Sequence, residues 1–192
     1  MGRRAEQVDE TRQRIVDATV HLHSTVGPAR TTISAIAELA GVTRLTVYRH
    51  FPEQDALYAA CGQEWQRRHP APDPGAWLEI EDLGARARHG LGELYGWYRQ
   101  HGEALLPIYR DLDSMPVAVR EETLAEFQQF ADAMVAGAGL TGRAQRRLHA
   151  AAGHAVNFWT WRSLCIDQGL DDEEAVELAA SLITNALRAE RQ

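Results

Sequence analysis

Several hydrogen-bond donors are concentrated in one short stretch of the chain: Arg44, Thr46, Tyr48, Arg49 and His50. Guanidinium and hydroxyl groups bind phosphate oxygens, and an arginine can also hold O6 and N7 of a guanine with two donors. No acidic residue lies between Leu39 and Pro52. These residue types therefore predict a local surface for DNA.

Two short helices must position these donors. Thr32 and Thr43 are each suited to cap a helix, and Gly41-Val42 turns the chain between the two helices. In the second helix Val47 and Phe51 are spaced to point inward. This pattern indicates a helix-turn-helix, whose second helix lies in the major groove. An ordinary corner between helices remains the alternative, although a corner does not require such a collection of donors.

The rest of the chain is predicted to be helical, so the fold class is all-α with about nine helices. Apolar residues recur with helical periodicity from residue 11 to residue 189, and no segment alternates as a strand does. The apolar positions expected to face the interior are Ile15, Ala18, Leu22 and Val26 of the first helix, Ile33, Ile36, Ala37 and Ala40 of the second, Leu57 of the fourth, and Ile80, Leu83, Ala87, Leu91, Leu94 and Tyr98 of the fifth.

Helix boundaries follow from breaker residues. The stretch "PAPDPGAW" after His69 predicts a connector, and Pro107 is expected to end the fifth helix. Pro116 suits the start of the next helix, which Leu124, Phe127, Ala131 and Met134 should line and the glycine-rich stretch "AGAGLTG" should end.

The last two helices are expected over residues 143–168 and from Asp171 onward, where Asp171 and Glu174 resemble a capping box. Both helices carry apolar residues on two faces. One face can pack on the core of the protein itself, which leaves the second for another molecule. The simplest arrangement is a homodimer formed through these two helices.

Composition restricts the class of protein. No stretch reaches the length of an apolar membrane span and residues 1–10 lack a secretory signal, so a cytoplasmic protein without a membrane partner is expected. Cys61 and Cys165 lie too far apart in sequence to suggest a metal knuckle or a disulfide framework. The net charge is −7, yet residues 1–60 are neutral overall, so all the excess negative charge belongs to residues 61–192. The chain contains no lysine.

The segment "TTISAIAELAGVTRLTVYRHFPEQDALYAA" resembles the amino-terminal DNA-binding domain of the TetR family of transcriptional regulators, over about residues 11–60. The resemblance implies a DNA-binding domain at residues 1–52 and a ligand-binding and dimerisation domain at residues 53–192. It further implies a repressor that leaves a palindromic operator in double-stranded DNA when a small molecule binds. An activator with the same fold remains open.

Carried over by position, the resemblance assigns phosphate contacts to Thr32, Thr43, Tyr48 and His50. It assigns base or groove contacts to Ser34, Arg44, Leu45 and Thr46. Leu45 stands where the family commonly has glycine or another small or turn-compatible residue, so contact with a thymine methyl is an alternative role for it. Gln54 stands where the family usually has lysine, which leaves one backbone contact neutral and puts operator affinity in question. Arg3 and Arg4 either form an arm into the minor groove or belong to a solvated tail.

Aromatic and polar residues of the later helices predict a pocket for the effector: Tyr98, Tyr109, Phe127, Phe130, Met134, His154, Asn157 and Trp161. Ordinary core packing is the alternative for each of them. His154 and Asn157 are expected to be buried polar groups that need partners, which a ligand can provide. Without lysine to hold an anion, an aromatic pocket favours an apolar or cationic effector.

No catalytic function is indicated, because the chain lacks a nucleophile elbow, a phosphate-binding loop, a dinucleotide-binding glycine pattern and a zinc-protease motif. We therefore expect neither an enzyme nor a cofactor. His21 and His23 point to different faces of one helix, which argues against a metal site. A helical sensor or carrier that has lost DNA binding remains the rival interpretation. The sequence identifies neither the effector nor the operator.

Overall fold

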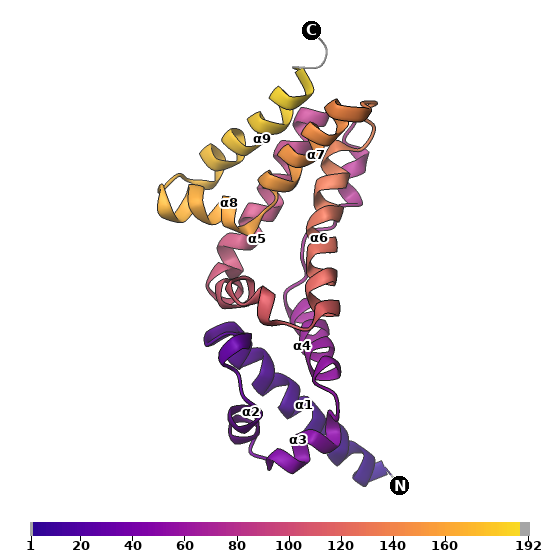
Figure 1. Cartoon of the computed structure of the whole chain (residues 1–192), viewed down its shortest axis with the longest axis vertical. Coiled ribbons are helices and arrows are strands. Elements are labelled where there is room, and N and C mark those ends of the chain that lie inside the picture. The colour runs from indigo at the N-terminus through magenta and orange to yellow at the C-terminus, as the bar shows by residue number, and fades with distance from the viewer. Residues whose placement is uncertain (1, 189–192) are drawn as a thin grey trace. The chain divides into compact units, whose positions relative to one another are not determined.

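The computed structural model describes the backbone of residues 2–188 and the side chains of residues 6–188. Nine α-helices and no strand occur in this described part of the chain, which confirms the all-α prediction (Figure 1). In chain order the helices are α1 (Gly2–Thr25), α2 (Ile33–Leu39), α3 (Arg44–His50), α4 (Gln54–Arg68), α5 (Leu83–Arg110), α6 (Val117–Val135), α7 (Gly142–Ala155), α8 (Phe158–Trp161) and α9 (Asp172–Arg188).

The chain folds into two compact units. The first unit comprises the residues up to Pro70 together with residues 103–122, and the second comprises residues 71–102 and the chain from Thr123 onward. Helix α5 therefore begins in the second unit and ends in the first. The boundary predicted after residue 52 is a functional one and stays a prediction.

The first unit is built on α1, which packs against α2 and α4, while α2 packs against α3. Ile15, Val47, Phe51 and Leu57 are all buried in its core, as their spacing predicts. Val26 was expected on the inner face of α1, and this expectation is wrong. Its side chain is 40% exposed, because α1 ends at Thr25 and the chain turns away from the helix axis.

The link between α1 and α2 is held by two charged residues from the end of α5. The backbone N–H of Ala29 donates to Oδ2 of Asp111 over 3.1 Å, and the Arg110 guanidinium donates to the Val26 carbonyl over 3.0 Å. Arg110 also pairs with Asp111 at 2.7 Å. The guanidinium lowers the pKa of the Asp111 carboxyl, with help from the Ala29 amide. Gly27, in the link, has a φ of 98°.

Pro107 does not end the fifth helix, contrary to the prediction. Helix α5 continues through it to Arg110. A proline inside a helix removes one backbone hydrogen bond and clashes with the preceding turn, at a cost of about 3 kcal/mol. Here the final turn makes the tertiary contacts of Arg110 and Asp111, which offset that cost. Ile80, expected in the same helix, precedes its first residue, Leu83.

His23 is buried in the first unit between α1 and α4. Its ring packs against Tyr58 with centroids 4.8 Å apart and planes tilted by 44°, and its Nδ1 lies 3.6 Å from the Cys61 sulfur. Burial raises the pKa of the Cys61 thiol to about 12 and lowers the pKa of His23 to about 4. The protonated thiol can therefore donate to a neutral imidazole.

Acidification should destabilise the protein through His23. The unfolded chain binds a proton on this residue near pH 6.5, whereas the folded chain does so only near pH 4. The contribution of neutral His23 to the free energy of unfolding is thus fully present above pH 6.5 and is lost as the pH falls toward 4. The loss is about 2 kcal/mol between pH 7 and pH 5. Urea unfolding at the two pH values should show this loss in the wild type. The loss should be smaller by that amount in His23→Leu, and an equal loss in both proteins would contradict the assignment.

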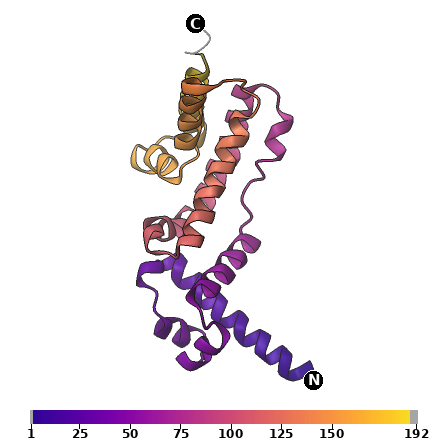
Figure 2. The same cartoon turned by 45° about the vertical axis from the view of Figure 1, so that its right-hand side comes forward.

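An extended connector joins α4 to α5, as the proline-rich stretch predicts (Figure 2). Its one regular element is a short 3₁₀ turn at Ala76–Glu79. Trp77 in this turn is fully buried, and its Nε1 donates to Glu93 over 2.7 Å. The connector thereby contributes a large ring to the core of the second unit.

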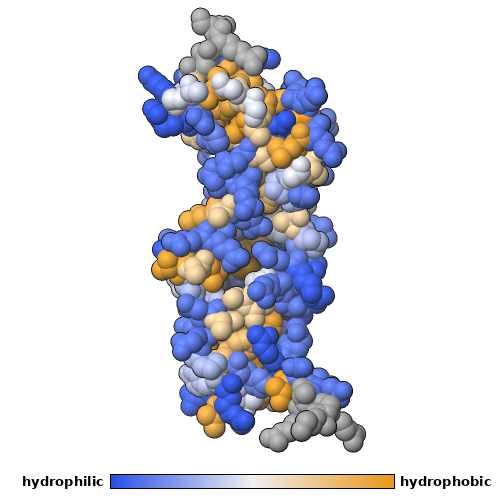
Figure 3. Space-filling view, turned by 90° about the vertical axis from the view of Figure 1, so that its right-hand side faces the viewer, coloured by the Kyte–Doolittle hydropathy of each residue, from blue (hydrophilic) through white to orange (hydrophobic). Residues whose placement is uncertain are grey.

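Helix α6 buries Phe130, Ala131 and Met134, but Leu124 was wrongly expected to face inward and is exposed. On the face of the molecule seen in Figure 3, apolar side chains stand in separate groups on a mainly hydrophilic surface.

The buried Arg86 donates to the carbonyl of Ala136 over 2.7 Å, just beyond the end of α6. The guanidinium therefore satisfies a backbone acceptor at the helix terminus.

Residues 143–168 do not form one helix, contrary to the prediction. Helix α7 ends at Ala155, and α8 begins at Phe158 and continues as a π-helical segment over Arg162–Asp167. The break is possible because hydroxyl groups satisfy the carbonyls it frees. Tyr95 donates to the carbonyl of Ala155 over 2.9 Å and Tyr98 to that of Val156 over 2.8 Å.

Helix α9 starts as predicted. The Glu174 N–H donates to Asp171 over 2.9 Å and the Asp171 N–H donates back to Glu174 over 3.3 Å, which completes a capping box. One side of α9 packs along α7. Leu178 and Leu182 remain exposed on another side, so the second apolar face of this helix is present at the surface.

Two glycines of α5 lie against tryptophan rings in the second unit. A Cβ at Gly90 would stand 2.9 Å from the ring of Trp77, and a Cβ at Gly102 would stand 2.7 Å from the ring of Trp161. Real Cβ atoms do not approach other atoms so closely. Each glycine thus allows a large ring to pack directly on the helix backbone.

Alanine at these positions should destabilise the protein, whereas alanine elsewhere on the same helix should not. We expect Gly90→Ala and Gly102→Ala each to cost about 1 to 3 kcal/mol, because a ring must move. Gly92 and Gly96 have no atom within 4 Å of the position that an added methyl group would take, so alanine there should stabilise by up to about 1 kcal/mol. Urea unfolding of the four variants tests this, and four equal effects would contradict it.

Candidate nucleic-acid interface

The turn between α2 and α3 depends on a glycine. Gly41 has a φ of 65°, and its N–H donates to the Glu38 carbonyl over 3.1 Å. The next N–H, from Val42, donates to the Ala37 carbonyl over 2.9 Å. These two bonds form a Schellman motif, which closes α2 and redirects the chain at once into α3. The predicted helix-turn-helix is therefore present.

Threonine side chains start both helices, as predicted. Thr32 accepts a hydrogen bond from the N–H of Ala35 over 3.1 Å, and Thr43 accepts one from the N–H of Thr46 over 3.2 Å. The hydroxyls of Thr43 and Thr46 also lie 2.9 Å apart. These bonds fix the first turn of α3 and place two hydroxyl groups side by side at its start.

The structure places every predicted DNA-contacting side chain at the surface of this helix pair. Val47 and Phe51 take the inward positions of α3, and the remaining positions face outward. Leu45 is 69% exposed and Tyr48 is 53% exposed. The exposed members are Thr32, Ser34, Thr43, Arg44, Leu45, Tyr48 and Arg49, and the half-buried ones are Thr46 and His50. Their contacts with DNA stay a prediction.

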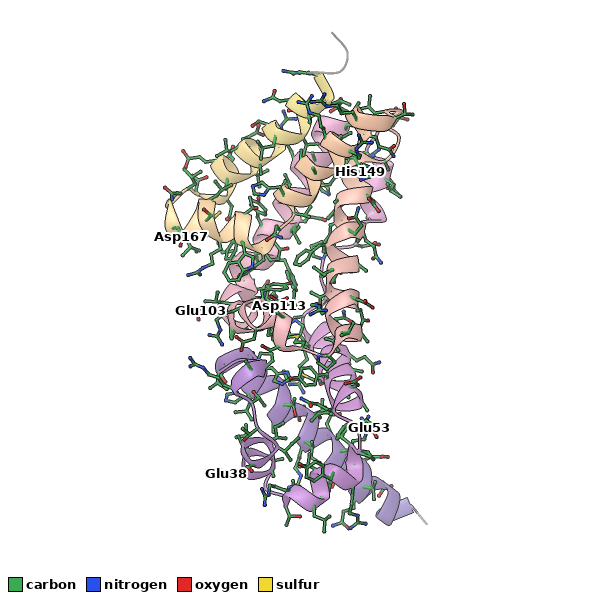
Figure 4. The ribbon with its side chains drawn as sticks, in the orientation of Figure 1. Glu38, Glu53, Glu103, Asp113, His149 and Asp167 are labelled. Atoms are coloured by element: carbon green, nitrogen blue, oxygen red, sulfur yellow. The ribbon has the colours of Figure 1, made fainter. Side chains whose placement is uncertain are left out.

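Charge on the first unit is distributed unequally. Five arginines precede α4 among the described side chains: Arg12, Arg14, Arg30, Arg44 and Arg49. No carboxylate described at residues 6–188 lies within ion-pair distance of any of them. On α4, by contrast, Arg67 and Arg68 bind Glu64 and lower its pKa to about 2. Glu38 and Glu53, the acids that flank α3 in sequence, lie on opposite sides of this unit in Figure 4.

The first helix also bears on the question of an amino-terminal arm. Arg3 and Arg4 belong to α1, whose backbone is helical from Gly2. Their side chains lie outside the described ones, so a contact with the minor groove stays a prediction.

The predicted effector residues come from both units of the chain. Tyr109 belongs to the first unit, and the other seven belong to the second. Tyr98 and Trp161 pack together at a ring distance of 5.7 Å, while Phe130 packs against Trp77 at 5.6 Å. Tyr98, Phe130, Met134 and Trp161 are buried, and Phe127 and Tyr109 are half-buried.

The prediction that His154 and Asn157 are buried polar groups without partners is wrong. His154 is exposed at the end of α7, rather than buried among apolar side chains. Asn157 caps α8, since its Oδ1 accepts from the N–H of Trp159 over 2.9 Å. Helical periodicity failed here because the helix breaks between them. Neither side chain therefore requires a ligand as its partner.

Trp97 of α5 has a buried polar atom without a partner among the described residues, a feature that residue type alone does not reveal. Its indole Nε1 is buried, and the described residues offer it no hydrogen-bond acceptor. A buried donor without a partner costs about 1 to 3 kcal/mol.

A hollow of about 200 Å³ in the second unit lies between α6 and α7, beside Asp132 and His149. None of the eight predicted effector residues lines it.

Comparison with known proteins agrees with the helix-turn-helix. The family model described as "Bacterial regulatory proteins, tetR family" matches residues 15–61. The HTH-type transcriptional regulator TtgR of Pseudomonas putida is 45% identical over 67 residues, which are 35% of this chain and 32% of TtgR. AcrR of Shigella flexneri is 40% identical over 88 residues, 42% of this chain and 41% of AcrR. The chain thus spans less than half the length of these curated relatives.

Solved structures share the fold over nearly the whole chain. A tetR-family transcriptional regulator from Streptomyces coelicolor superposes with a TM-score of 0.58 at 20% identity, covering 95% of this chain and 82% of that one. A TetR transcriptional regulator from Rhodococcus sp. RHA1 gives 0.54 at 19% identity, covering 95% and 97%. At such identities the likeness concerns the fold.

Proposed function

We propose that the chain is a member of the tetR family of bacterial regulatory proteins, whose model matches residues 15–61, and that it is a homodimeric DNA-binding regulator, a repressor released from its operator by a small molecule. The observation that carries this proposal is the outer surface of α3. Arg44 is exposed there beside the hydroxyls of Thr43 and Tyr48, while Val47 anchors the helix from within. In this proposal residues 1–52 bind DNA and residues 53–192 bind the effector and the second subunit.

The dimer is proposed to form through the last two helices. Leu178 and Leu182 of α9 are exposed, and so are Trp159 of α8 and Ile166 of the π-helical segment that follows it. A second copy that covers these side chains removes their apolar surface from water. Two α3 helices about 34 to 36 Å apart, or a further multiple of one DNA turn, then read an approximately palindromic operator.

The effector is proposed to be apolar or cationic and to bind among the aromatic side chains of the second unit. Trp97 supports this choice and adds a requirement, because its buried Nε1 calls for an acceptor atom on the ligand. Among the described residues no helix has the length and apolar character needed to cross a membrane. A regulator of this kind acts in the cytoplasm, where the DNA is.

A gel shift with the DNA that flanks its gene tests the proposal. At moderate salt we expect a specific complex that survives an excess of random DNA, and an affinity that falls steeply as salt is raised. A screen of apolar and cationic compounds for release of the bound DNA then identifies the effector class. If no specific complex forms, the regulator proposal fails.

One observation favours a second function, a helical sensor or carrier that has lost DNA binding. The first turn of α4 contributes the neutral Gln54 and the acidic Asp55, rather than a cation, beside α3. Such a protein would bind the effector but show no salt-dependent affinity for DNA, since only released counterions produce that dependence. Transcription measured with and without the protein separates a repressor from an activator.

A further inference from the structure

An arginine of α1 is held next to the end of α3. The guanidinium carbon of Arg12 lies 4.6 Å from the centroid of the Phe51 ring. Phe51 is buried and directly follows His50, the last residue of α3. The cation of Arg12 is therefore positioned beside the carboxyl end of α3, although Arg12 lies far from it in sequence.

This stacking leaves the donors of Arg12 available. A cation–π contact with a ring does not pair the five N–H groups of a guanidinium with an oxygen or nitrogen acceptor. Arg12 is exposed, and none of the side chains described at residues 6–188 places a carboxylate within ion-pair distance of it. The ring thus restricts where the charge lies without neutralising it or occupying its donors.

The charges that follow α3 make this position significant. Beyond Phe51 the chain continues with Pro52, Glu53, Gln54 and Asp55. These residues carry two carboxylates and no cation. The last turn of α3 contributes Arg49 and His50, and Arg12 adds a further cation from α1 next to them, which strengthens the attraction for a phosphate against the two carboxylates.

We propose that Arg12 binds a backbone phosphate of the DNA and that Phe51 positions it. The inference rests on the proposed function and extends the interface from α2 and α3 to α1. Because a phosphate contact carries no sequence information, Arg12 contributes affinity and register rather than base recognition. Its loss should weaken binding to operator and to random DNA alike.

The salt dependence of DNA binding tests this proposal. Each phosphate contact contributes about 0.9 to the slope of log K against log salt concentration. In a dimer with two DNA-binding domains, Arg12→Gln should lower that slope by about 2, whereas Arg12→Lys, which keeps the charge, should leave it nearly unchanged. The matched control is Arg146→Gln, which removes an exposed arginine of α7, outside the proposed DNA-binding domain.

Thermal unfolding of each variant separates binding from folding. If Arg12→Gln lowers the unfolding temperature and leaves the slope unchanged, Arg12 only packs on Phe51 and the proposal is overturned. An equal loss of slope in Arg12→Gln and Arg146→Gln also overturns it, because net charge alone would then explain the effect. Failure of the wild type to bind DNA would instead refute the proposed function, so the two failures are distinguishable.

Discussion

Arg44→Ala should reduce the affinity for operator DNA by about 2 to 6 kcal/mol for the dimer, which is on the order of 30-fold to 10⁴-fold. Arg44 is exposed on the first turn of α3, where the hydroxyls of Thr43 and Thr46 fix the helix start. A two-donor contact with a guanine provides about 1 to 3 kcal/mol of discrimination, and a dimer makes it twice. Affinity for random DNA should fall much less. Titration of the labelled operator and of a scrambled duplex at one salt concentration measures both.

Tyr48→Phe is the matched control for this prediction. The change removes only a hydroxyl from an exposed side chain of the same helix. If that hydroxyl contacts phosphate, its loss should weaken operator and scrambled duplex by the same factor, so the ratio of the two affinities stays constant. Should Arg44→Ala also leave this ratio constant, Arg44 does not read bases.

Gly27→Ala should be the most destabilising of the single-methyl changes, at about 2 to 5 kcal/mol. The φ of 98° at Gly27 lies in the region that an alanine adopts only at a cost of about 1 to 2 kcal/mol. The added Cβ would also stand 2.3 Å from Oδ2 of Asp111 and 2.4 Å from the Arg110 guanidinium. Both groups must then leave the link between α1 and α2. A buried carboxylate that loses a donor adds about 1 to 3 kcal/mol.

Thermal unfolding measures this loss as a decrease in midpoint of about 5 to 15 °C for a chain of this length. Gly62→Ala on α4 serves as the control, because no atom lies within 4 Å of its added methyl group. That variant should be stabilised by up to about 1 kcal/mol. If Gly27→Ala proves as stable as Gly62→Ala, the Arg110 and Asp111 contacts do not hold the link.

The helix-turn-helix could be predicted from sequence because every signal it needs is local. The caps at Thr32 and Thr43 and the turn at Gly41 each act on residues within four positions. Val47 and Phe51 face inward by the period of one helix. For the same reason Asp171 and Glu174 revealed the start of α9.

Predictions failed where distant residues decide the structure. Tyr95 and Tyr98 lie about sixty positions from the carbonyls that they satisfy at the break after α7, so periodicity alone extended that helix too far. His154 and Asn157 were misassigned with it. The sequence predicts a helix end at Pro107, but α5 continues past it. The contacts at its end reach back more than eighty positions to Val26 and Ala29, where local sequence cannot predict them.

The all-α character, the helix-turn-helix and the residue types on the outer face of α3 are all readable from the amino-acid sequence. The end of α7, the continuation of α5 past Pro107 and the contact of Arg12 with Phe51 depend instead on how the chain folds. The difference is one of range. Helix propensity, capping and periodicity act between near neighbours, whereas burial and the pairing of polar groups depend on whichever distant segment the folded chain brings into contact.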